Sequence, residues 1–167
     1  MIADMNGDPT PLRWDNVDSR LIGDDMDVGY DFDGPLRIDG VANYVRGTRR
    51  DIDDNLYRIA PPNVTVGLTF EASIWSVTVE GRAVVKQSKV SATDSEATTG
   101  GYALLSLYGD WQVKDNVTLS AGVENVFDEV YQDHLSGYNR NGFGGIPVGE
   151  RIPSSGRGLF SRLSVVK

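Results

Sequence analysis

His134 is the only histidine in the chain and the first side chain to test for chemistry, because imidazole is the commonest metal ligand among protein side chains. It follows Asp133, and Asp128 lies a few residues upstream. One imidazole gives no metal-binding spacing by itself. A loop histidine that hydrogen-bonds to the backbone is therefore the ordinary alternative to a metal contact.

Asp51-x-Asp53-x-Asn55 has the spacing with which a calcium-binding loop begins. Such a loop needs glycine at its sixth position and a bidentate glutamate at its twelfth. This chain has Leu56 and Pro62 there. The pattern therefore predicts a solvated acidic loop, with weak cation binding at most.

A third set of side chains that could do chemistry lies at alternating positions, on the polar face of segments whose other face is apolar. Its members are Asp25, Asp27, Glu80, Arg82, Glu124 and Arg162. A catalytic role, as in barrel lipases or proteases, would need a nucleophile activated by a base, and no serine here has that context. Cysteine is absent, which excludes disulfides and thiolate metal sites. We expect no enzyme, no catalytic or metal site and no cofactor, and interpret the set as the lining of a wet interior with cross-strand ion pairs.

These charges are carried by segments in which apolar and polar residues alternate, which is the period of a β-strand. The alternation predicts strands over 19–32, 36–48, 64–71, 75–86, 103–111, 117–124 and 159–165. Residues 6–16, with an Asn-Gly pair and two prolines, are expected to form a loop. No segment shows a sustained helical period.

The predicted connections alternate in length along the chain. Short turns are expected at 33–35, 72–73 and 114–116, and long polar loops at 49–63, 87–100 and 127–156. In an antiparallel meander all short turns then lie at one end of the sheet. Aromatic residues also flank the short turns: Phe32, Phe70, Trp75 and Trp111.

Strands of this length, a charged face and an aromatic girdle are typical of outer-membrane barrels. The predicted fold class is all-β, an antiparallel up-and-down transmembrane-type β-barrel segment of about seven to eight strands. The alternation is equally compatible with a soluble sandwich or lipocalin-like barrel whose apolar face points inward.

Composition limits the remaining classes. The chain of 167 residues is long enough for one domain, and no window approaches the ~20 apolar residues that a membrane-spanning helix needs. The net charge of -8 argues against a nucleic-acid partner, because binding to phosphates requires clustered cations.

The segment 119–140 resembles the last hairpin of TonB-dependent outer-membrane receptors, in which Gly-x-x-Asn-Leu-Phe-Asp-x-x-Tyr precedes the final extracellular loop. The matching residues, with valine in place of the leucine, are Gly122, Asn125, Val126, Phe127, Asp128 and Tyr131. Gly156 and Arg157 resemble the Pro-Gly-Arg entry into the last strand. Residues 57–62 and 21–27 are similar to two earlier strand elements of the same family.

The resemblance implies a fragment, residues 1–167, from the C-terminal part of a receptor barrel without plug domain or signal peptide. Its implied setting is the outer membrane of a Gram-negative cell, with lipid as a partner and contact to the TonB complex only through a plug that this chain lacks. The implied ligand is a metal chelate, siderophore-like, or haem, cobalamin or copper. Asp133, His134 and Arg140 are then the candidate extracellular ligand contacts.

Two alternatives stay open from the sequence. One is a small standalone outer-membrane barrel of eight strands with a structural or adhesive role, and the other is a soluble ligand-binding β-barrel.

Overall fold

The computed structural model describes residues 2–3, 9–10, 16–141 and 145–166. Its strands are β1 (Ile2–Ala3), β2 (Pro9–Thr10), β3 (Ser19–Asp31), β4 (Leu36–Arg49), β5 (Asn63–Glu71), β6 (Trp75–Val84), β7 (Tyr102–Lys114), β8 (Val117–Glu124) and β9 (Gly158–Val165). Among these residues no helix has the length and apolarity required to cross a membrane.

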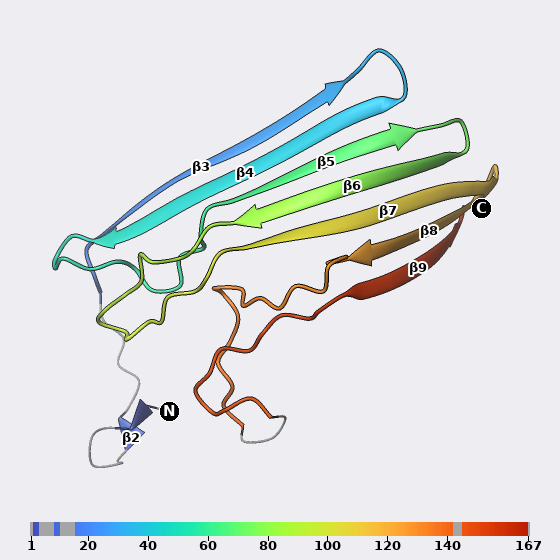
Figure 1. The fold of residues 1–167 in the computed structure, drawn as a ribbon. Helices are drawn as coiled ribbons and strands as arrows, with labels where there is room; N and C mark the ends of the chain where they lie inside the picture. Colours follow the sequence, from blue (N-terminus) through green and yellow to red (C-terminus); the bar gives the residue numbers. More distant parts are fainter. Residues whose placement is uncertain (1, 4–8, 11–15, 142–144, 167) are drawn as a thin grey trace.

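Strands β3 to β9 form one seven-stranded sheet in chain order, each antiparallel to the next (Figure 1). Strand order and class confirm the predicted all-β meander. The expected boundaries differ mainly at β6, which ends at Val84 rather than near Lys86, and at β7, which continues to Lys114. Within the described part of the chain, β3 and β9 each pair along one side only.

One expectation about the N-terminal residues was wrong. In the expected loop 6–16, Pro9 and Thr10 form strand β2, which pairs with Ile2 and Ala3 of β1. Residues 6–8 and 11–15 of that loop lie outside the described residues. The pairing is possible because Pro9 is at a strand start, where a missing N–H costs little.

The short turns lie at one end of the sheet and the long loops at the other, as the sequence predicts. The short turns 32–35, 72–74 and 115–116 lie at one rim, at the right of Figure 1, together with the C-terminal end of β9. The long loops 50–62, 85–101 and 125–157 lie at the opposite rim. Gly34 adopts a φ of 123° in the first short turn, a conformation that a side chain would strain.

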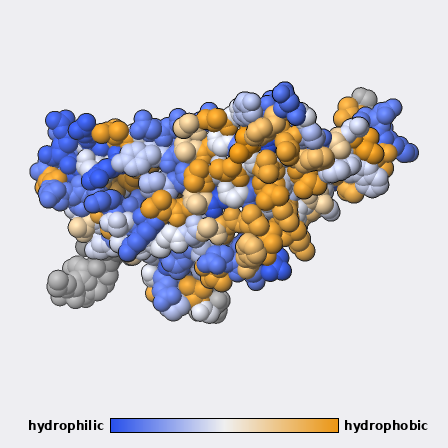
Figure 2. All heavy atoms as spheres, turned by 45° about the horizontal axis from the view of Figure 1, so that its top comes forward, coloured by the Kyte–Doolittle hydropathy of each residue, from blue (hydrophilic) through white to orange (hydrophobic). Residues whose placement is uncertain are grey.

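The pairing register assigns every strand residue to one of two faces. The apolar face continues across all seven strands, as in the row Tyr30, Ile38, Leu68, Val79, Leu107, Val123 and Leu159. Its side chains remain uncovered: Met26 is 61% exposed and Leu159 77%. Figure 2 shows hydrophobic residues gathered over the strands, with hydrophilic residues at the left, where the long loops lie.

A dry core is absent from the described residues, where Val84 and Pro61 are the buried apolar side chains. A soluble sandwich or lipocalin-like barrel would bury its apolar face, at ~25 cal/mol gained per Å². This sheet leaves that face open on all its strands. In transmembrane barrels the apolar face of the strands is the one that lipid covers.

Aromatic rings lie beside the short turns, where the sequence places them. Phe70 and Trp75 stack with ring centroids 5.3 Å apart, and Tyr30 meets Phe32 edge-on at 4.9 Å. Trp111 is the cross-strand partner of Trp75. Such amphipathic rings are typical of a membrane–water boundary.

The polar face carries all six charged residues that were expected there, but the predicted ion pairs among them were wrong. The described ion pairs of the chain involve none of the six. Their cross-strand partners are uncharged: Glu80 opposes Ser106, and Arg82 opposes Leu104. Neutral contacts link the strands instead, such as Thr69 Oγ1 to Thr78 Oγ1 at 2.8 Å.

Candidate functional site

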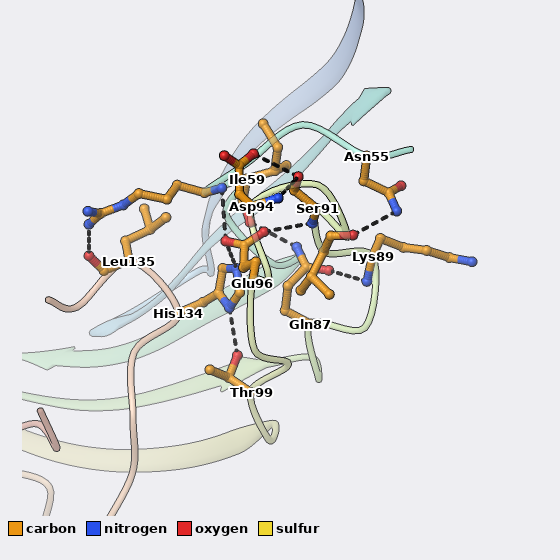
Figure 3. Close-up of polar contacts among 12 residues, drawn as sticks. Asn55, Ile59, Gln87, Lys89, Ser91, Asp94, Glu96, Thr99, His134 and Leu135 are labelled. Atoms are coloured by element: carbon orange, nitrogen blue, oxygen red, sulfur yellow. Dashed lines mark hydrogen bonds and ion pairs between the residues drawn. The ribbon is translucent and has the colours of Figure 1, made fainter. Parts of the chain in front are cut away.

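Glu96 connects all three long loops at their rim (Figure 3). Its Oε1 accepts hydrogen bonds from the backbone N–H of Arg58 at 2.9 Å and from Nε2 of His134 at 3.1 Å. Its Oε2 accepts one from the backbone N–H of Ser91 at 2.9 Å. The side chains of Glu96 and His134 are each 1% exposed, so the connection is shielded from water. We call Glu96, His134 and Thr99 the loop latch.

Burial favours the neutral imidazole of His134. In the neutral imidazole Nε2 donates to the carboxylate of Glu96, which can only accept, and Nδ1 accepts from the hydroxyl of Thr99, 3.0 Å away. Burial lowers the pKa of His134 below its ordinary 6.5, and the charge of Arg151 lowers it further, against the opposing carboxylate of Glu96.

Arg151 fixes the backbone around the latch from the other side of the last loop. Its Nη1 donates to the carbonyls of His134 and, at 3.1 Å, of Ser136. Its Nη2 donates to the hydroxyl of Tyr138 at 2.8 Å, and the guanidinium lies 4.6 Å from the centre of that ring. This combination of fork geometry and ring stacking is specific to arginine.

Asp54 is a second connection between the first two long loops. Its carboxylate accepts from the backbone N–H groups of Asn55, Ala92 and Thr93 at 2.8–2.9 Å. The hydrogen bond of the Thr93 side chain, followed by those of the backbone N–H groups, holds the pKa of Asp54 well below its usual value of 3.8.

In the calcium-like pattern Asp51-x-Asp53-x-Asn55, the first carboxylate is hydrogen-bonded to an arginine. Asp51 accepts from Nε of Arg49 at 2.9 Å, and this side-chain hydrogen bond lowers the pKa of Asp51. Among the described residues, no three or more histidine, cysteine, aspartate or glutamate side chains gather as a metal-holding group would.

The three candidate ligand contacts occupy different environments. His134 is buried in the latch, and Asp133 accepts from the hydroxyl of Tyr102 at 3.2 Å and from the backbone N–H of Leu135 at 2.8 Å. Arg140 is exposed on the last loop. The structure therefore turns Asp133 and His134 toward the protein and Arg140 toward solvent.

The motif residues Asn125 and Asp128 shape the path by which the chain leaves β8. Both have positive φ, 51° and 57°. The Asn125 side chain donates to the carbonyl of Glu129 and accepts from its N–H, both at 2.9 Å. Asp128 Oδ1 accepts from the N–H of Arg157 at 2.8 Å, and a Cβ on Gly156 would lie 2.5 Å from that oxygen. The two ends of the last loop are thus joined.

Other motif residues pack β7, β8 and β9 together. A Cβ on Gly122 would lie 2.5 Å from the Phe160 ring and 2.8 Å from that of Tyr108, so only glycine fits under these rings. The rings of Tyr131 and Tyr102 are 4.2 Å apart. Val126 donates its N–H to a carbonyl of β7, whereas Phe127 is 75% exposed.

A hollow of about 330 Å³ opens on the polar face below the long loops. Its lining combines both charges with hydroxyls and an amide: Glu80, Arg82, Ser106, Tyr108, Glu124, Asn125, Tyr131 and Ser155. Tyr108 donates to Glu80 there at 3.4 Å. This is a wet, mixed-charge surface that suits a polar ligand or a polar protein segment.

The fold and the two faces of the sheet define the class of this chain, which is a segment of a transmembrane-type β-barrel with its long loops at one rim. The chain belongs to the TonB-dependent receptors, since the family model for the "TonB dependent receptor-like, beta-barrel" matches residues 1–126. This is a family of transport receptors of the Gram-negative outer membrane and not of enzymes. The hairpin 119–140 lies mostly beyond the matched residues.

Solved structures agree. The structure titled "Copper transporter OprC" is 30% identical with a TM-score of 0.84, over 90% of this chain and 24% of its own. The ferric yersiniabactin uptake receptor FyuA from Yersinia pestis is 16% identical with a TM-score of 0.63, over 88% of this chain and 23% of its own, which shows the fold alone. The chain thus spans about a quarter of each. No curated protein sequence matches it.

Sequence reasoning missed Asp54, Glu96 and Arg151. Each lies in a polar loop without a motif, and each has a partner 17 to 39 residues away in the chain. No local pattern marks such residues, because their function depends on loops that meet only in the folded chain.

Proposed function

We propose that residues 1–167 form the C-terminal part of the barrel of an outer-membrane receptor that imports a scarce metal as a chelate or as copper. The sheet contributes lipid-facing wall, and its long loops capture the ligand on the outside. Energised passage is the task of a plug and the TonB complex, with which the whole receptor acts.

The observation that carries this proposal is the two-faced sheet itself. An apolar face left open on seven strands is tolerable only against lipid, and open sheet edges are not tolerated within lipid. The edges of β3 and β9 therefore favour further strands on both sides and argue against a small standalone barrel.

The nature of the cargo is supported by the comparisons. The 30% identical neighbour is titled a copper transporter and the 16% identical one a ferric yersiniabactin uptake receptor. Copper and a ferric siderophore are accordingly the first two ligands to test, with haem and cobalamin after them.

Among the candidate contacts, Arg140 is assigned to the ligand and His134 to positioning. An exposed guanidinium on the last loop can pair with the carboxylates or oxygens of an anionic chelate. His134 acts through the latch that holds this loop over the rim.

The test is uptake by cells that carry the gene containing this sequence. Radioactive copper and a radioactive ferric siderophore are offered to the wild type, a deletion strain, a complemented strain and a strain without TonB. The expected result is loss of uptake of one ligand in both the deletion and the TonB-free strains, with the protein in the outer-membrane fraction. Uptake of every ligand unchanged by the deletion would sink the proposal.

A further inference from the structure

A notch in the sheet opens on the apolar face at the long-loop rim. Strand β4 continues to Arg49, but β5 begins only at Asn63, because Pro61 and Pro62 have no N–H for the ladder. The pairing of β4 with β5 therefore ends where Asn43 opposes Asn63. Beyond that point no strand of the sheet lies along β4 on this side; residues 54–56 meet its end at the isolated bridge of Thr48 with Asn55, and the segment that follows β6 forms the other wall.

The notch contains two adjoining cavities, and both are lined by Tyr44, Pro62 and Val85. The larger, about 370 Å³, continues down the apolar face past Met26, Ala42, Val64 and Ala83. Two of these side chains are single methyl groups, so the sheet is hollowed there. This part of the notch has the shape and polarity for a hydrocarbon chain.

The smaller cavity, about 220 Å³, has cationic walls. Arg46, Lys86 and Lys89 line it, and all three are exposed. Within the described residues none of the three side chains has an ion-pair or hydrogen-bond partner. The Lys89 side chain extends away from the latch (Figure 3). In a chain of net charge -8, three unpaired cations at the end of an apolar groove need an anionic partner.

We propose that the notch binds a phosphorylated lipid of the surrounding membrane leaflet, with phosphate on Arg46, Lys86 and Lys89 and an acyl chain in the larger cavity. The inference rests on the membrane placement proposed above. A phosphate group carries enough charge to face several cations at once, and lysine and arginine beside an apolar surface are the usual partners of anionic headgroups.

Asp24 sets the direction of the lipid. It lines the larger cavity only, opposite Tyr44 on the neighbouring strand. Its carboxylate repels a phosphate, so the headgroup is confined to the Arg46 end. The aromatic ring and hydroxyl of Tyr44 then lie between the two parts, as tyrosine does at membrane boundaries.

The experiment measures lipid binding to the intact receptor in detergent by native mass spectrometry. The probes are bisphosphorylated lipid A, its dephosphorylated form, phosphatidylcholine and inorganic phosphate. The variant Arg46→Ala/Lys86→Ala/Lys89→Ala is expected to bind bisphosphorylated lipid A about a hundredfold more weakly than the wild type. The control Lys114→Ala/Arg157→Ala/Arg162→Ala removes the same charge elsewhere and is expected to bind like the wild type.

Two more variants test the groove and the direction. Ala42→Phe/Ala83→Phe fills the larger cavity and is expected to weaken lipid A binding while leaving inorganic phosphate binding unchanged. Asp24→Asn is expected to bind lipid A at least as tightly as the wild type.

Equal binding by the wild type and the cation variant, or equal binding of dephosphorylated and phosphorylated lipid, would overturn the lipid site. Inorganic phosphate that competes at the concentration of the lipid itself would also overturn it, in favour of a plain anion site. A receptor in the outer membrane that shows these results refutes this inference alone. A receptor absent from the outer membrane refutes the proposed function as well.

Discussion

Replacing His134 by alanine tests the idea that this side chain holds the extracellular loops rather than the ligand. The change removes one hydrogen bond to the carboxylate of Glu96 and one to the hydroxyl of Thr99. A hydrogen bond to a charged group contributes about 1.5 to 3 kcal/mol and a neutral one about 1 kcal/mol. The latch should therefore lose about 2 to 4 kcal/mol of local stability.

Hydrogen exchange of the intact receptor in detergent measures that loss directly. Amides around Ser136 and Ser91 are expected to exchange roughly 30- to 1,000-fold faster in His134→Ala, while amides in β6 and β7 are unchanged. The exposed neighbour Leu135 supplies a matched control, Leu135→Ala, with little effect. Unchanged exchange of the loops in His134→Ala would refute the latch.

Acid should weaken the same latch in the wild type. The folded protein lowers the pKa of His134, so the unfolded or opened loop binds a proton more readily than the closed one. The contribution of His134 is complete above its ordinary pKa of 6.5 and is lost as pH falls from there through the lowered value. Loop exchange, corrected for its intrinsic pH dependence, should accelerate below pH 6.5 in the wild type and not in His134→Ala. Stronger protection in acid would contradict the sign.

Three further substitutions test the other contacts. Gly122→Ala forces a methyl group to within 2.5 Å of Phe160 and should lower the free energy of unfolding by about 1 to 3 kcal/mol. On a gel, the variant should change from folded to unfolded migration at a lower temperature than the wild type. Gly81→Ala, whose added methyl group has no atom within 4 Å, should migrate like the wild type. Asp128→Ala removes the acceptor for the Arg157 N–H and should speed proteolysis of loop 125–157. Asp128→Asn should be cleaved at an intermediate rate, because asparagine tolerates positive φ and keeps an acceptor. Equal cleavage of the wild type and both variants would count against the role of Asp128. Asp54→Asn should loosen Ala92 and Thr93 at neutral pH, because their N–H groups donate to Asp54 and not to the latch. In the wild type these two amides should stay protected until the pH falls below 3.8, since the lowered pKa of Asp54 keeps its contribution above that value. Loss of their protection together with that of Ser91 near pH 5 would argue against a separate role for Asp54.

The alternation of side chains alone determined the strands, the two faces and the two rims. A strand has a period of two residues, so a single sequence shows which side chains share a face, and turn lengths show which ends lie together. The structure confirms these expectations from β3 to β9. The same alternation could not say whether the apolar face points inward or outward. The barrel family to which the chain belongs favours the outward direction, and the sheet leaves that face open on all its strands.

The site was decided by tertiary structure. His134 was conspicuous in the sequence as the only histidine, but its partner Glu96 is 38 residues away and Arg151 is 17 residues away. The notch likewise combines the end of β4 with residues 85–89, which adjoin only because β5 begins late. Local periodicity carries no information on contacts between loops, because these depend on how far each strand continues before its chain turns. The opposite charges that the sequence suggested as pairs on the polar face fail to meet for the same reason: pairing register, and not spacing, selects the neighbours.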